Sequence, residues 1–142
     1  MIDRIYPVWY AFVGGNPSVN IYRRDMMQKE RFKTIAYTSK TGAPVFKNEF
    51  LGLESRDLVK TTAAIQVLEE YGNMIPRSMS KKLVGDIFEL RVTGDRKEIR
   101  VLYAFRAGRI ILLLSCFVKK TQKTPLNEIV TAQARLKEYL NQ

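Results

Sequence analysis

The chain has 142 residues, of which 46% are hydrophobic and 27% charged, so it can bury one domain core and is too apolar for a disordered chain. Lys and Arg number 24 against 14 Asp and Glu, and the net charge of +10 favours a polyanionic partner, most often nucleic acid, over a merely basic surface. The lone Cys116 and the lack of histidine exclude an internal disulfide, a multi-cysteine zinc site and histidine catalysis. No apolar run reaches the length of about 18 residues that a spanning helix needs.

The first 30 residues differ in character from the rest and are predicted to be an N-terminal extension, followed by one domain over residues 31–142. The extension holds a short aromatic and apolar run from Pro7 to Val13, and Asn16-Pro17 could begin a short helix. The run is shorter than a signal peptide requires and no A-x-A cleavage site follows it. We therefore expect a cytoplasmic protein.

From Arg31 onward the hydrophobic pattern predicts an α+β domain. Apolar residues every three or four positions indicate a helix over Ser55–Gly72. Thr124-Pro125 predicts the start of another helix, with Thr124 as its N-cap and Pro125 in its first position. Short turns between three apolar runs favour an antiparallel meander. We expect an antiparallel sheet of about four strands with helices packed on one face. The expected strands are 31–38, 87–92, 99–105 and 110–118.

The positive charge is concentrated in residues 73–124, which contain twelve Lys or Arg and four Asp or Glu. Strand alternation brings Glu89, Arg91 and Arg100 onto one exposed face and leaves Tyr103 on the apolar face. Arginines on a rigid sheet can be aimed at phosphates, although ordinary cross-strand pairing of solvent-facing charges would give the same pattern.

A second cluster of polar residues lies between the last strand and the last helix. Its lysines, hydroxyls and helix start suit a phosphate, although a solvated loop is the alternative. Lys81 and Lys82, which precede a strand, add to the same cationic rim or are plain surface charge. Cys116 alternates with leucines and is expected in the core. The cluster comprises Lys119, Lys120, Thr121, Lys123 and Thr124.

The segment from Phe117 to Pro125, FVKKTQKTP, together with the strand pieces Phe88–Arg91 and Ile99–Tyr103, resembles the phage-derived HigB-like branch of the RelE toxin superfamily. The resemblance covers about residues 31–140. It implies a RelE-like fold and the toxin of a type II toxin–antitoxin pair, a metal-independent endoribonuclease that cuts mRNA, usually on the ribosome. It also implies a silencing antitoxin, commonly a helix-turn-helix protein, and no cofactor.

The family's strand arginines match Arg91 and Arg100, and its lysines after the last strand match Lys119, Lys120 and Lys123. Arg100 is the first choice for stabilising charge on the phosphate and Arg91 the second, and Glu89 is a candidate general base. The expected catalytic residues are Arg100, Arg91, Lys120, Lys119 and Glu89. The expected RNA-binding residues are Lys81, Lys82, Lys119, Lys120, Lys123, Thr121 and Thr124. The family offers no counterpart for the first 27 or so residues. The other functions that fit the sequence are a noncatalytic nucleic-acid-binding or phage accessory protein, and an interaction protein that docks through its aromatic N-terminal segment.

Overall fold

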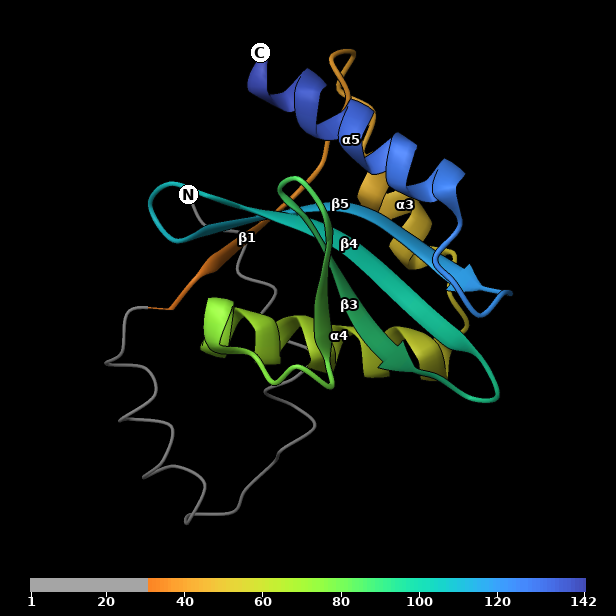
Figure 1. Cartoon of the computed structure of the whole chain (residues 1–142). Coiled ribbons are helices and arrows are strands. Elements are labelled where there is room, and N and C mark those ends of the chain that lie inside the picture. Colours follow the sequence, from red (N-terminus) through yellow and green to blue (C-terminus); the bar gives the residue numbers. More distant parts are fainter. Residues whose placement is uncertain (1–30) are drawn as a thin grey trace. The chain divides into compact units, whose positions relative to one another are not determined.

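The computed structural model describes residues 31–142, in which five strands form one sheet in the order β1-β5-β4-β3-β2 (Figure 1). The expected N-terminal extension over residues 1–30, with its possible helix start at Asn16-Pro17, lies outside the described residues. The elements are β1 Lys33–Ala36, α3 Val45–Leu51, α4 Ser55–Tyr71, the 3-10 turn η1 Gly72–Met74, β2 Ser80–Val84, β3 Ile87–Thr93, β4 Glu98–Arg106, β5 Ile110–Lys119 and α5 Leu126–Leu140.

Strands β3, β4 and β5 form the antiparallel meander that the short turns predicted. Strand β1 pairs with β5 in parallel, and β2 adds an antiparallel edge beside β3. The α+β class is therefore confirmed, but the sheet is mixed and has five strands within the described residues, not about four. The additional strand is β2, whose five residues include Lys81 and Lys82 and show no clear alternation of apolar and polar residues.

The expectation that the helices cover one face of the sheet is wrong. Figure 1 shows α4 on one face and α3 and α5 on the other. Both alternating sets of residues in the central strand β4 are buried, and neighbouring Val101 and Leu102 are each 0% exposed. Helix α3 has only seven residues, too few to show a helical period in the sequence.

Helix α4 packs through Thr61, Ala64, Ile65 and Leu68, all of them buried and spaced three or four residues apart. Its first turn is fixed by Asp57, which is 1% exposed and accepts a hydrogen bond of 2.8 Å from the backbone N–H of Asp95. This contact holds α4 against the turn between β3 and β4, beside the cationic part of the sheet.

Helix α5 is attached to the opposite face by Arg135. Its guanidinium binds both carboxylate oxygens of Glu49 on α3, at 2.9 and 3.1 Å, and donates to the carbonyl of Leu114 and the hydroxyl of Ser115 on β5. A bidentate pair of this kind fixes orientation as well as distance. It sets the position of α5, and so of the loop that leads into it. No helix within residues 31–142 is both long and apolar enough to cross a membrane.

Candidate nucleic-acid site

Glu89, Arg91 and Arg100 meet on the face of the sheet that carries α3 and α5. Arg91 and Arg100 are direct partners in the β3–β4 register. One carboxylate oxygen of Glu89, Oε1, lies 3.1 Å from Nε of Arg91 and 3.6 Å from Nε of Arg100. The predicted grouping of these three residues is confirmed, and a single carboxylate lies against two guanidinium groups.

The face is less exposed than strand alternation suggested, because α3 and α5 cover part of it. Glu89 is 3% exposed and Arg100 6%, whereas 38% of the Arg91 side chain is exposed. Arg100 also donates from Nη1 to Glu98 and to the backbone carbonyl of Ile99, each at 3.0 Å. Glu98 is an additional member of the site; the strand period places it on the correct face, but no motif singles it out. Arg91 is thus the accessible arginine, and Arg100 is almost fully buried.

Thr124 connects the loop before α5 to this cluster. Its hydroxyl donates to Oε2 of Glu89, the oxygen that the arginines leave free. The predicted role of Thr124 as the helix N-cap is wrong: the N-cap is Pro125, and it makes no side-chain capping bond. The Thr124 hydroxyl binds the Glu89 carboxylate and not a backbone N–H of the helix, so this contact attaches the loop to the arginine cluster.

The lysine loop, residues 119–124 between β5 and α5, is connected to the cluster through Thr124. Lys119 pairs with Glu98 in the β4–β5 register and so projects on the same face as Arg100. Its ammonium donates to the carbonyl of Gln122, and Thr121 donates to the carbonyl of Lys123 at 2.6 Å, so the loop is internally braced. Lys120 and Lys123 are exposed.

The two lysines of β2 project on opposite faces of the sheet. Lys81 pairs with Glu89 and faces the arginine cluster. Lys82 pairs with Phe88 on the α4 face, where its ammonium lies 5.9 Å from the centre of the Phe88 ring. The sequence-based expectation of one shared cationic rim therefore holds for the placement of Lys81 and not for that of Lys82.

Two other predictions about side chains on the sheet are confirmed. Tyr103 lies on the α4 face, where its hydroxyl is 2.6 Å from that of Ser80; burial raises its pKa, and the bond to Ser80 partly opposes this shift. Cys116 is 5% exposed in the core, and burial raises the pKa of its thiol to about 12. Neither group is suited to proton transfer near neutral pH.

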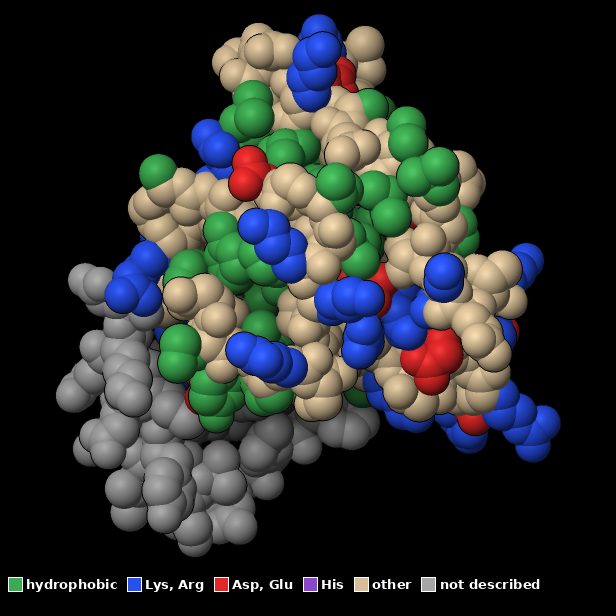
Figure 2. Space-filling model, viewed as in Figure 1, with side chains coloured by type: hydrophobic (Ala, Val, Ile, Leu, Met, Phe, Trp, Pro, Cys, Tyr) green, Lys and Arg blue, Asp and Glu red, His purple; other side chains and the backbone are tan. Residues whose placement is uncertain are grey.

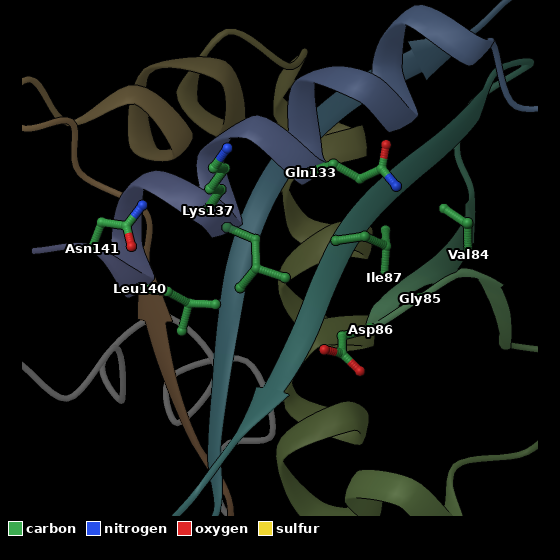
Figure 3. A pocket seen from close by; sticks show the side chains of 9 residues that line it. Val84, Gly85, Asp86, Ile87, Gln133, Lys137, Leu140 and Asn141 are labelled. Carbon is green, nitrogen blue, oxygen red and sulfur yellow. The ribbon is translucent and has the colours of Figure 1, made fainter.

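A cavity of about 320 Å³ lies away from the arginines, between α5 and the turn that joins β2 and β3 (Figure 3). Ile87 and Leu136 are among its apolar lining residues, and its charged side chains are Asp86 and Lys137. A cavity with one carboxylate and one ammonium does not select a polyanion, so the cationic site remains the candidate for nucleic acid.

The model of one protein family, described as phage-derived Gp49-like protein (DUF891), matches residues 48–137. The chain belongs to this family. The matched part of this Gp49-like protein contains the arginine cluster, Glu89 and the whole lysine loop.

Two relatives have the name "Probable endoribonuclease HigB1" and come from the CDC 1551 / Oshkosh and ATCC 25618 / H37Rv strains of Mycobacterium tuberculosis. Each is 39% identical to this chain over 98 residues, which are 68% of this chain and 74% of the relative. The expected relationship to HigB-like toxins is confirmed.

Proposed function

We propose that this Gp49-like protein is the toxin of a type II toxin–antitoxin pair, a metal-independent endoribonuclease that cuts mRNA on the ribosome and arrests translation. The observation that carries the proposal is the pair of arginines held by one carboxylate beside a braced lysine loop. The similarity to proteins named as endoribonucleases supports the same reaction class. We place the reaction in the cytoplasm, where mRNA is translated.

Cleavage without a metal requires attack by the ribose 2′-oxygen on the adjacent phosphorus. A 2′-O–P bond forms, the P–O5′ bond breaks, the 2′-OH proton leaves to a base, and the 5′-oxygen gains a proton. Negative charge accumulates on the phosphate oxygens in the transition state. A planar guanidinium can bind two of these oxygens. We assign this task to Arg91, in place of Arg100, the first choice from the sequence, because Arg100 is only 6% exposed.

Glu89 is better placed to orient the arginines than to remove a proton. Its Oε1 is engaged by Arg91 and Arg100 and its Oε2 by Thr124. We therefore assign Glu89 as a positioning residue, in place of the general base that the sequence suggested. The Lys120 ammonium, which is exposed at the rim, can donate the proton that the 5′-oxygen gains, and solvent water takes the 2′-OH proton. Lys81, Lys119 and Lys123 attract the RNA backbone.

Without histidine, slow intrinsic chemistry is expected, and alignment of the message by the ribosome would supply much of the acceleration. Correct orientation of reacting groups can lower a barrier by about 7–11 kcal/mol. The proposal includes a cognate antitoxin, expected to be a small helix-turn-helix protein, that binds the toxin and silences it.

The test is to incubate the purified chain with ribosomes translating a defined message and to map new 5′ ends. We expect cleavage by the wild type, loss of cleavage in Arg91→Ala, and unchanged cleavage in Lys60→Ala, which removes an exposed cation from α4. Binding of the message without any new ends would contradict the proposal and favour a noncatalytic RNA-binding protein.

A further inference from the structure

A second cationic surface lies on the other side of strand β2. A cleft of about 210 Å³ on the α4 face is lined by aromatic, basic and hydroxyl side chains. Figure 2, viewed as Figure 1, shows Lys and Arg side chains gathered to the right of the centre, and hydrophobic side chains with further Lys and Arg to the left. Lining residues that matter here are Arg77, Ser80, Lys82, Phe88, Tyr103 and Phe105.

The aromatic rings of the cleft pack against one another, and Phe88 is the candidate ring for base stacking. Phe88 stacks on Tyr103 at 5.5 Å between ring centres and meets Phe105 edge-on at 5.2 Å. Phe88 is only partly buried, and the ammonium of Lys82 lies 5.9 Å from the centre of its ring. The hydroxyls of Ser80 and Tyr103 lie beside it. Every nucleobase has a face that can stack on such a ring.

The charge of the cleft favours RNA over a protein partner. Its lining includes Arg77 and Lys82, both exposed, and no Asp or Glu. A volume of about 210 Å³ is below the usual range for drug-sized ligands and suits a single base. Positive charge interleaved with aromatic rings is the common arrangement for binding single strands.

Strand β2 connects the two cationic surfaces because it is an edge of the sheet. Neighbouring residues on a strand point to opposite faces, so Lys81 faces the arginine cluster and Lys82 faces the cleft. We propose that single-stranded RNA crosses the β2 edge, with phosphates on Lys81 and Lys82 and one base stacked on Phe88. This inference rests on the proposed function and defines the path of its substrate beyond the cleavage site.

The experiment measures binding of the full chain to fluorescent 2′-O-methyl RNA, which lacks the attacking hydroxyl and is not cut. On the proposed path, a trinucleotide binds mainly at the arginine site, whereas a decanucleotide also crosses the β2 edge. Lys82→Ala should weaken decanucleotide binding about fivefold and lower its salt slope by about 0.7, with little effect on the trinucleotide. Phe88→Leu keeps an apolar side chain and should weaken decanucleotide binding about fivefold or more.

Lys60→Ala is the matched control, because it removes one exposed positive charge away from the cleft. Equal effects of Lys82→Ala and Lys60→Ala on the decanucleotide would overturn the proposal. If Phe88→Leu does not fold by circular dichroism, the Lys82→Ala result decides. Cleft variants that bind RNA normally but fail to capture the antitoxin would make the cleft a protein-binding surface, which also overturns it.

The same experiment separates the two proposals. Loss of trinucleotide binding in Arg91→Ala reports on the arginine site, and loss of decanucleotide binding in Lys82→Ala reports on the cleft. A protein that shows both losses yet never cuts a message would refute the proposed endoribonuclease and leave the RNA path across β2 intact.

Discussion

Arg91 and Arg100 stand directly opposite each other on β3 and β4, and Oε1 of Glu89 lies 3.1 Å from the Nε of the first and 3.6 Å from that of the second. Like charges directly opposite in a sheet are unfavourable. The carboxylate offsets this repulsion and holds the two guanidinium groups where a phosphate could bind. This geometry makes the two arginines unequal in their effect on the fold, since only one of them is buried.

The first prediction concerns stability. Arg100→Ala would leave the buried carboxylate of Glu89 with Arg91 and Thr124, so its cost should stay below the figure of about 3–5 kcal/mol for a buried charge left with no partner. Arg91→Ala removes a partly exposed partner and should cost about 1 kcal/mol or less. Urea unfolding of both variants measures the difference. Equal free energies of unfolding would contradict the burial of Arg100.

The second prediction separates positioning from base catalysis at Glu89. Glu89→Gln keeps the shape of the side chain and removes its charge. If Glu89 only orients the arginines, cleavage should fall while the shape of the pH–rate profile below pH 7 stays unchanged. If Glu89 is the general base, the acidic limb of the profile should disappear together with most of the rate. The comparison uses single-turnover cleavage by both proteins across a pH series.

Thr124 provides the third prediction. Thr124→Val has nearly the same shape but cannot donate to Glu89, so the loop should lose its attachment to the site. We expect the free energy of unfolding to fall by about 1 kcal/mol. The cleavage rate should fall by more than this change in stability explains, and Thr124→Ser should keep the rate near that of the wild type. Thr131→Val is the control, because the Thr131 hydroxyl bonds only to the Asn127 carbonyl on α5. Matching losses of cleavage in Thr124→Val and Thr131→Val would contradict an attachment specific to the site.

The sequence predicted the meander well because each of its strands has a strong apolar pattern and a short turn follows. It also placed Glu89, Arg91 and Arg100 on one face, since the period of a strand does not depend on tertiary packing. The exposure of that face could not be predicted in the same way. It depends on α3 and α5, which cover part of that face. The Glu49–Arg135 pair joins these two helices, although the two residues are far apart in the sequence.

The missed elements share a physical cause. Strand β2 and helix α3 are short, and their existence depends on neighbours that complete their hydrogen bonds and cover their apolar side chains. Without β2 in the prediction, Lys81 and Lys82 looked like one patch. A strand at that position necessarily directs them to opposite faces.

The fourth prediction concerns the lysine loop. Replacing Lys119, Lys120 and Lys123 together by Gln should weaken RNA binding and flatten its salt dependence by about 0.7 log units for each phosphate that the loop no longer neutralises. Titrations of a 2′-O-methyl oligonucleotide at several salt concentrations give the slope. An unchanged slope would mean that the three lysines only make the loop soluble.

The last prediction concerns alkaline stability. The thiol of Cys116 has its pKa raised to about 12 by burial, with Glu49 adding to the shift, from an ordinary value of 9.0. Above pH 9 the unfolded chain therefore loses this proton while the folded chain keeps it, so rising pH favours unfolding through this group. Between pH 8 and pH 10 the free energy of unfolding should fall by about 1.4 kcal/mol through this group, because the unfolded thiol titrates over about one pH unit above its pKa in this range.

Cys116→Ala removes this contribution while Tyr103, whose pKa is also raised, remains in both proteins. Urea unfolding at pH 8 and pH 10 should therefore show a smaller decrease for the variant than for the wild type, even though the smaller side chain lowers its stability at both values. A thiol reagent at pH 8 should label the wild type only after denaturation, because Cys116 is 5% exposed and its thiol is protonated in the fold. Rapid labelling of the folded protein, or equal decreases in the two proteins, would contradict the buried position of Cys116.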